Sequence, residues 1–488
     1  MRTERGGTKR ARGRKQTNKQ TNKQTRAQAD THKSADRASR SIENSIIFKM
    51  STVASHWREV KSASILESDG QIHLDDMQRK LATAIEVAVE SLRARRRIAA
   101  KAPASKETLP IETIDISPFL SESVNDETRE ARQRVADQVR KCWQEMGFLS
   151  LVGHGIAHED MIALKESTLE FLNGMSIAEK LKLNEQWPDE LKAMERGQAA
   201  VFRGYSPPYV ENLALFQGKK GIAPDDCEKF TVGALPDPSF VPPTEFLDEE
   251  AAKYYRGTTG ENIFPDQYPK FKAAMEKYIA YMQRIAIALM KACALALDLP
   301  EDFLVKKVAP GGFVAGTQRI LHYPARQNVD PADRIQAHTD GGLLTLLWRP
   351  DDMDSEDATQ VTGGLEVLHE GKWKRAPQPT YDALTINIAD LFAWWSNGRF
   401  VSTPHRVSPP CGKQTKERVA FPFFLVPNND MEISPLIELS NECAPTGNSV
   451  TMRYGKWFDI RSKHLGGIDV DLDGIPNVSR PDIYKDIQ

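Results

Sequence analysis

The sequence predicts an α+β protein, and two features of its hydrophobic periodicity lead to this expectation. Between about Gln267 and Leu297 apolar residues recur every three or four positions, which predicts one long amphipathic helix. From Thr317 onward the period changes to two, and turn residues separate short strands. The predicted strands are Arg319–Tyr323, Ile335–Thr339, Leu343–Trp348, Gly364–His369, Lys372–Arg375, Ala383–Ile388, Phe400–Val407 and Arg418–Leu425. Eight short antiparallel strands match a jelly-roll barrel, or double-stranded β-helix, which the long helix would back.

A mixed α/β region is expected before these strands. Its short strands alternate with helices, and a loop-rich, proline-rich stretch follows from about 187 to 266. A connection this long inside a compact domain is usually functional or mobile. The expected elements are a strand near Ile111–Ile116, a helix from about Asp126 to Met146, a strand Phe148–Val152, and helices near 158–173, 177–183, 301–308, 391–396 and 450–464.

The chain divides by composition into five expected parts. They are a basic low-complexity tail (1–49), a helical extension and linker (50–107), an N-terminal region (108–300), a jelly-roll domain (301–430) and a C-terminal extension (431–488). The tail is too polar to offset its chain entropy by burial, which predicts disorder. Three explanations of the tail stay open: a basic segment that contacts anionic partners, a transit peptide, or upstream sequence that is not normally translated. The ordinary-looking start at Met50 favours the last.

Composition narrows the class of protein. Lys and Arg number 65 against 67 Asp and Glu, so no global charge indicates a nucleic-acid partner. No apolar run approaches the length of a membrane-spanning helix, so none is expected. The five cysteines are scattered without CxxC spacing, which argues against a disulfide framework or a zinc site. We expect a monomer in a reducing, cytoplasmic compartment, with a small-molecule substrate and neither nucleic acid nor membrane as partner.

One motif carries potential metal ligands. His338 and Asp340 stand at i and i+2 where a predicted strand ends, so both side chains would point to one face. His405 follows in a second strand. Two histidines and one carboxylate on one face of a metal are the arrangement of non-haem Fe(II) oxygenases. Arg418 follows on the last strand, and its planar fork suits a carboxylate. A further histidine, His154, sits in a turn without a carboxylate at i+2, so we interpret it as structural.

Several other motifs occur in a fixed order along residues 111–427. They are Ile114-Asp115-Ile116-Ser117; Gly147-Phe148 with Gly153-His154-Gly155-Ile156; Glu228-Lys229-Phe230-Thr231-Val232-Gly233; Asn262-Ile263-Phe264-Pro265; and Tyr323-Pro324. Together with the histidine, aspartate and arginine motifs, they resemble the isopenicillin N synthase-like branch of the Fe(II)/2-oxoglutarate-dependent dioxygenases. Three of them are variant: Gly153 replaces the family's Asn in Asn-His-Gly-Ile, Glu228-Lys229 inverts its Lys-Glu, and Phe264 stands at the Trp of its Asn-x-Trp-Pro.

The resemblance implies a site and a reaction. His338, Asp340 and His405 would bind Fe(II), and 2-oxoglutarate would take two of the remaining metal positions. Arg418 would pair with its far carboxylate, and the Tyr323 hydroxyl would also reach it. O2 would take the last position. A small organic metabolite would then be hydroxylated, desaturated or ring-closed, with release of succinate and CO2.

Some departures from the family leave alternatives open. The family has Arg-x-Ser, but here the third residue is Ala420, and Leu321 replaces the Asn that precedes Tyr-Tyr-Pro. His322 would either compensate or simply pack. An oxidase without 2-oxoglutarate and a non-catalytic jelly-roll binding module are the alternative functions. The expected walls of the substrate site are Arg203, Tyr205, Trp348 and Phe424, and Arg203 would favour an acidic substrate.

Overall fold

The fold is known from a computed structural model. It describes residues 107–122, 125–184, 203–208, 211, 225–235, 262–325, 334–351, 363–409, 416–428, 430–434, 436 and 452–458. The predicted tail (1–49), the predicted extension up to residue 106, Cys411 and Cys443 lie outside the described residues. So does most of the loop-rich stretch between 187 and 266.

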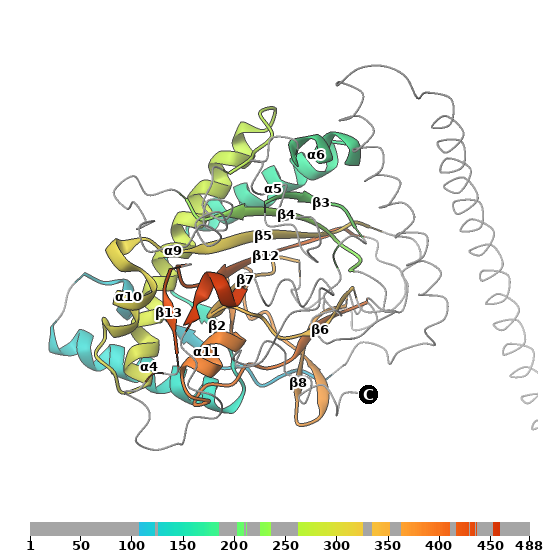
Figure 1. The fold of residues 1–488 in the computed structure, drawn as a ribbon. Coiled ribbons are helices and arrows are strands. Elements are labelled where there is room, and N and C mark those ends of the chain that lie inside the picture. The colour runs from blue at the N-terminus through green and yellow to red at the C-terminus, as the bar shows by residue number, and fades with distance from the viewer. Residues whose placement is uncertain are drawn as a thin grey trace, which may run out of the picture. The chain divides into compact units, whose positions relative to one another are not determined.

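The described strands form three sheets (Figure 1). The large sheet has the order β1-β2-β10-β7-β12-β5-β4-β3, the small sheet β6-β11-β8-β9, and β13 pairs with β14. The strand bounds are β1 Thr113–Asp115, β2 Phe148–Val152, β3 Gly204–Ser206, β4 Glu228–Gly233, β5 Gly316–Tyr323, β6 Ile335–His338, β7 Leu344–Trp348, β8 Gly364–His369, β9 Lys372–Arg375, β10 Leu384–Ile388, β11 His405–Ser408, β12 Arg418–Leu425, β13 Glu432–Ile433 and β14 Met452–Arg453.

The two larger sheets pack face to face through their side chains. Phe148 of the large sheet shares an apolar cluster with Leu365 and Val367 of β8. A second cluster joins Tyr323 of β5 to Ile335 of β6. Among the described residues no strand pairing joins these two sheets, so they form a mixed α/β arrangement of facing sheets without a closed barrel. The contact between the sheets is made by apolar side chains instead of a continuous hydrogen-bonded ladder.

Helix α9, Pro269–Ala296, packs against the large sheet (Figure 1). Its Tyr278 contacts the rings of Trp348 on β7 and Phe421 on β12. By length and hydropathy α9 alone, among the described helices, is apolar enough to cross a membrane, but 61% of its most apolar window is buried inside the protein. This burial is what a core helix requires, and it agrees with the long helix predicted from periodicity.

The other helices follow the sequence signals except α3, which the sequence analysis did not predict. They are α3 Ser117–Leu120, α4 Asp126–Glu145, α5 His158–Gly174, α6 Ile177–Leu183, α10 Phe303–Val308 and α11 Asp390–Trp395. Asn125 caps α4 by accepting the Thr128 N–H, and the helix stops before Gly147. Gly147 has φ +73°, and a Cβ there would lie 2.1 Å from the Val401 carbonyl oxygen, so only glycine fits.

Several boundaries differ from the predictions. The strand predicted from Phe400 begins only at His405, and residues 401–404 have no regular structure. Strands β3 and β4 lie inside the stretch predicted as loop. In the region of the predicted C-terminal helix, residues 452–453 form β14 and 454–458 are helical. Short strands like β3 have too few residues to show a period of two in the sequence. Their formation depends instead on pairing with neighbouring strands.

An aromatic cluster between α9 and the large sheet gives a stability prediction. Phe271 of α9 is fully buried, and its ring lies 4.8 Å from Phe171 of α5 and 5.6 Å from Phe230 of β4. We expect Phe271→Ala to lower the free energy of unfolding by about 3–5 kcal/mol, because it removes these contacts and leaves a cavity. Urea denaturation measures this change. The exposed neighbour Lys270→Ala should change it by less than about 0.5 kcal/mol, and equal effects of the two would contradict the packing.

Candidate active site

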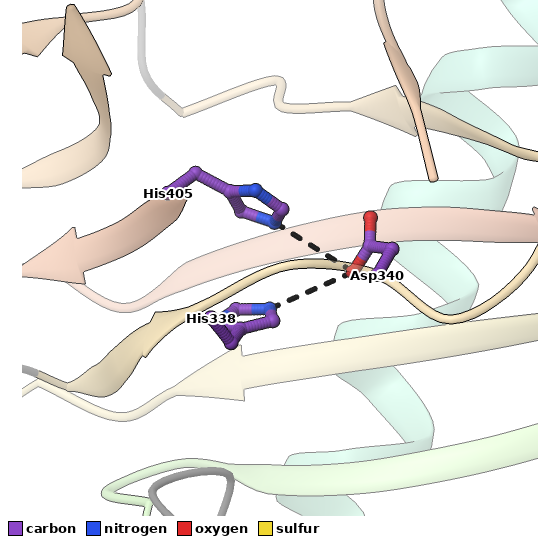
Figure 2. A group of neighbouring side chains, drawn as sticks. All are labelled: His338, Asp340 and His405. Atoms are coloured by element: carbon purple, nitrogen blue, oxygen red, sulfur yellow. Dashed lines mark ion pairs between the residues drawn. The ribbon is translucent and has the colours of Figure 1, made fainter. Parts of the chain in front are cut away.

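Three side chains that are far apart in the sequence meet between the sheets. His338 is the last residue of β6, and His405 is the first residue of its neighbour β11, where the two are register partners. Asp340 lies two residues beyond β6. Each histidine places its Nε2 atom 3.6 Å from the same oxygen, Oδ1 of Asp340 (Figure 2). The three ligand atoms lie within 4.8 Å of one another, and all three residues are buried. The predicted triad is therefore assembled.

Backbone carbonyls fix both imidazoles. Nδ1 of His338 lies 2.7 Å from the Gln336 carbonyl oxygen, and Nδ1 of His405 lies 3.1 Å from that of Thr403. A carbonyl only accepts hydrogen bonds, so each Nδ1 carries the proton and donates it. The lone pair of each neutral ring is then on Nε2, which faces Asp340. This is the arrangement that holds a metal-binding histidine in the right tautomer and orientation.

The carboxylate of Asp340 is oriented by its other oxygen. Oδ2 accepts hydrogen bonds from the Thr345 hydroxyl at 2.5 Å and from the Asn387 amide at 2.8 Å. These partners come from β7 and β10 of the large sheet. Because Oδ2 is occupied in this way, Oδ1 is the oxygen that faces the two imidazoles. The sequence analysis missed both partners. A polar residue inside the apolar strand Leu384–Ile388 was the available signal for Asn387.

Asp390, at the start of α11, ties the two ligand-bearing segments together. Its carboxylate accepts hydrogen bonds from Thr339 at 2.9 Å and from Ser402 at 2.7 Å. Its backbone N–H donates to the Asp340 carbonyl oxygen at 2.8 Å. Thr339 stands between two of the ligands, and Ser402 precedes the third by three residues. The Asp390 carboxylate therefore holds in place both chain segments that carry the metal ligands.

Burial and mutual charge set the protonation of the triad. Burial lowers the pKa of His338 to about 4, and repulsion from His405 adds to this. Burial would also lower the pKa of His405, but attraction to Asp340 outweighs it and raises that pKa. Burial would raise the pKa of Asp340, yet its attraction to His405 and His338 and the Thr345 hydrogen bond hold it far below its usual value. The carboxylate is therefore ionised.

The donor set suits a divalent iron ion. Two imidazole nitrogens and one carboxylate oxygen converge from one side, each held by a partner outside the cluster. This is the two-histidine, one-carboxylate set of non-haem Fe(II) oxygenases, which leaves further metal positions for ligands. The residues present fit Fe(II) in chemistry and in orientation.

Arg418 and Tyr323 lie together on the large sheet. They are register partners on β12 and β5, and the Arg418 Cζ atom is 5.3 Å from the centroid of the Tyr323 ring. Both side chains are buried. Tyr323 packs against Ile335 of β6, the strand that ends in His338, so it faces the small sheet. Burial raises the pKa of Tyr323 well above its ordinary value, which keeps the phenol protonated and able to donate.

Of the predicted substrate residues, Phe424 lies on the face of the site. It stands at an even spacing from Arg418 on β12, and its register partner is Thr345, which contacts Asp340. Trp348 lies on the opposite face. It is three residues from Thr345, and it stacks on Phe421 and packs against Tyr278 of α9. The prediction that Trp348 lines the site is wrong, because the period of two does not say which face is which.

Arg203 and Tyr205 are also turned to other partners. Arg203 donates to the Asn262 side chain and is buried against Gly233. The Tyr205 hydroxyl donates to Glu228 at 2.5 Å, under the Lys180 ammonium. These contacts correct the expectation that the two residues reach a substrate. Residues missed by the sequence analysis share the face of Tyr323 on β5 and are partly exposed: Thr317, Arg319 and Leu321.

His154 and the cysteines have the surroundings expected of structural residues. His154 accepts the Ile156 N–H at Nδ1, and its Nε2 lies 2.9 Å from the Asp382 carbonyl oxygen. Both ring nitrogens are thus used within the fold. Cys142, Cys227 and Cys293 are free and buried.

Two models of known protein families match the sequence that forms this site. The model of the 2OG-Fe(II) oxygenase superfamily matches residues 315–427, which hold the triad, Tyr323 and Arg418. The model named non-haem dioxygenase in morphine synthesis N-terminal matches residues 111–267, and the two together span more than half of the chain. The chain belongs to the 2OG-Fe(II) oxygenase superfamily. It is therefore an oxidoreductase that uses Fe(II), 2-oxoglutarate and O2.

Named relatives are similar over most of this oxygenase. The 2-oxoglutarate-dependent dioxygenase tropC of Talaromyces stipitatus is 27% identical over 367 residues, 73% of this chain and 98% of tropC. Homoarginine-6-hydroxylase 2-ODD-C23 of Glycine max is 29% identical over 345 residues, 67% of this chain and 88% of that protein. Among solved structures, a full-length Neurospora crassa protein in complex with alpha-KG and thymine has a TM-score of 0.54 at 22% identity, over 74% of this chain and 98% of that one, which shows the fold.

The outer partners of Asp340 give a metal-affinity prediction. Asn387→Ala removes the amide that orients the carboxylate, so we expect Fe(II) affinity to fall roughly 10- to 100-fold. Anaerobic equilibrium dialysis with Fe(II) measures this. Gln133→Ala removes an exposed amide–aspartate hydrogen bond on α4 and should leave the affinity unchanged. Equal affinities of Asn387→Ala and the unaltered protein would contradict this role of Asn387.

Proposed function

We propose that this oxygenase oxidises a C–H position of a small organic metabolite by hydroxylation, desaturation or ring closure, with release of succinate and CO2. The observation that carries the proposal is the convergence of two imidazole Nε2 atoms on one oxygen of Asp340, with every other polar atom of the three ligands oriented by a partner. The names of the relatives support a small-molecule substrate, since one of them is a homoarginine-6-hydroxylase.

Each site residue then has a role. His338, Asp340 and His405 hold Fe(II), which when bound supplies the redox chemistry that couples decarboxylation of 2-oxoglutarate to oxidation of the substrate. Arg418 pairs with the far carboxylate of 2-oxoglutarate through its guanidinium fork. The protonated Tyr323 hydroxyl donates to the same carboxylate. Two observations support these roles. Arg418 and Tyr323 are register partners on β12 and β5, and the Tyr323 side chain faces the small sheet.

The inner face of the large sheet is the proposed wall of the substrate site. Its partly exposed residues are mostly apolar, and they contrast with the fully buried residues that alternate with them towards α9. They are Thr317, Leu321, Leu347 and Phe424. Arg319 shares this face, but its guanidinium is paired with Glu211 at 2.6 Å and donates to Thr231 at 3.1 Å. This wall favours a substrate with a sizeable apolar part. The Arg203 argument for an acidic substrate no longer applies, because Arg203 is directed to Asn262.

Two finer assignments belong to the same proposal. We infer that β5 to β12 constitute a double-stranded β-helix of the isopenicillin N synthase-like branch, supported by the orders β10-β7-β12-β5 and β6-β11-β8-β9 in two facing sheets. We also infer a reducing, cytoplasmic location, supported by the three buried free thiols of the described part of the chain.

An anaerobic titration tests the site directly. With Fe(II) and 2-oxoglutarate the protein should develop the weak visible metal-to-ligand charge-transfer band, and His338→Ala should abolish it because a ligand is lost. Arg418→Ala should raise the 2-oxoglutarate concentration for half the band by roughly 10- to 100-fold, since a charged hydrogen-bond partner is removed. Arg140→Ala, which breaks an ion pair between α4 and Asp298 beyond the end of α9, is the matched control.

The same titration separates the alternative functions. Iron binding without a band on addition of 2-oxoglutarate would contradict the proposed cosubstrate site and favour an oxidase. A protein that binds no iron would favour a binding module. Where the band appears, succinate release is followed across a panel of small metabolites, and its stimulation by none of them would contradict the proposed substrate class.

Ala420 offers a gain-of-function test. It stands two residues beyond Arg418 on the same face of β12, where the family has a serine. We expect Ala420→Ser to restore one hydrogen bond to the cosubstrate and lower its dissociation constant about two- to tenfold. The charge-transfer titration measures it, with Ala273→Ser on the exposed side of α9 as the control. An unchanged constant would mean that position 420 does not reach the cosubstrate.

A further inference from the structure

His322 lies on the face of β5 opposite Tyr323, buried between two carboxylates. Its Nδ1 atom is 2.6 Å from Oε1 of Glu228 on β4, and its Nε2 atom is 3.0 Å from Oε2 of Glu417. The side chain is 2% exposed. Apolar residues dominate the outer face of the large sheet around α9, so a bridge of ionisable side chains at this position needs a reason.

The bridge, which consists of Glu228, His322 and Glu417, lies beside the two proposed cosubstrate residues, Arg418 and Tyr323. His322 directly precedes Tyr323, and Glu417 directly precedes Arg418. The strands β5 and β12 pair with Arg418 opposite Tyr323, and with Val419 opposite His322. The His322–Glu417 contact therefore crosses the ladder at the same level as the Arg418–Tyr323 pair, on the other side of the sheet.

Both ends of the bridge are held by further groups. Glu228 accepts hydrogen bonds from Lys180 of α6 at 2.6 Å and from Tyr205 of β3 at 2.5 Å. Glu417 accepts one from Asn173 of α5 at 2.9 Å. Burial would raise the pKa of Glu228, but the hydrogen bond from His322 and the charge of Lys180 lower it to about 2, so Glu228 is ionised.

The two contacts determine how many N–H groups the His322 ring must donate. A neutral imidazole has one N–H, and a carboxylate without a proton can only accept. A ring that faces an ionised carboxylate at each nitrogen makes both hydrogen bonds only as an imidazolium. Such a ring fixes both carboxylates by charge-assisted hydrogen bonds, which are shorter and stronger than neutral ones.

Arg418 has a particular need for this support. It is the first residue of β12, so within its strand the ladder continues only on its C-terminal side. The Glu417 side chain supplies a fixed point on the other side of the Arg418 Cα atom. Two departures from the family motifs meet here as well: His322 stands at the first tyrosine of Tyr-Tyr-Pro, and its register partner Glu228 comes from the inverted Lys-Glu pair.

We propose that His322 is a positioning residue, which orients Arg418 towards the far carboxylate of 2-oxoglutarate by holding Glu417 against Glu228. This inference rests on the proposed role of Arg418. Through Asn173 and Lys180 the bridge also links α5 and α6 to the end of the sheet that carries Arg418 and Tyr323.

A double-mutant cycle on the full-length protein tests the proposal. The unaltered protein, His322→Gln, Arg418→Ala and the double variant are titrated with 2-oxoglutarate at saturating Fe(II) under anaerobic conditions. His322→Gln should raise the half-saturating 2-oxoglutarate concentration by about tenfold and leave Fe(II) affinity within about twofold. In the Arg418→Ala background it should add little, because its effect passes through Arg418.

Two further variants keep the test decisive. His158→Gln removes a different histidine–carboxylate contact, between α5 and Asp382, and should change neither titration. Glu417→Gln, at a half-exposed position, weakens the bridge without emptying the buried ring site and should raise the 2-oxoglutarate requirement severalfold. It serves if His322→Gln does not fold.

The outcomes are distinguishable. If Arg418→Ala raises the 2-oxoglutarate requirement and neither His322→Gln nor Glu417→Gln does, the positioning role is wrong while the site stands. If His322→Gln lowers Fe(II) affinity as much as 2-oxoglutarate affinity, or adds fully to Arg418→Ala, its effect is a general structural one and the proposal is overturned. If Arg418→Ala itself has no effect, the proposed role of Arg418 fails, and the inference with it.

Discussion

The site depends on how one buried carboxylate is shared. Asp340 presents Oδ1 to two imidazoles of the small sheet and Oδ2 to Thr345 and Asn387 of the large sheet. A buried charge is costly unless it is paired and hydrogen-bonded, so this residue favours only arrangements in which both sheets supply partners. The relative placement of the two sheets and the geometry of the metal ligands are therefore one constraint and not two.

The rest of the fold can be understood as support for that constraint. Register pairing of β6 with β11 brings His338 beside His405, and Asp390 fixes the segments that lead to them. The apolar clusters between the sheets keep them in contact away from the polar site. Helix α9 covers the outer face of the large sheet, which leaves only the inner face partly exposed for a substrate.

The sequence predicted what depends on local pattern. The long helix, the positions of most strands along the chain and the triad of His338, Asp340 and His405 all follow from spacing, because a period is written into consecutive residues. The face assigned to Trp348 was wrong because alternation defines two faces without saying which one is covered by a helix. That choice is made by α9, far away in the chain. Counting in steps of two from Thr345 gives the right face only once its contact with Asp340 is known.

Contacts that depend on register between distant strands could not be predicted. Whether His322 compensates for a lost polar group or simply packs was undecided from sequence, because the answer requires Glu228 and Glu417 to arrive on either side of it. Apolar residues of similar volume at such buried positions are often as stable as an ion pair, so stability alone does not explain these charges. What distinguishes this bridge from a packing contact is its place in the ladder, one residue from Arg418 and one from Tyr323. We infer that a charged group held there limits how far the Arg418 end of β12 can shift, which an apolar group, with no directional bond, would not do.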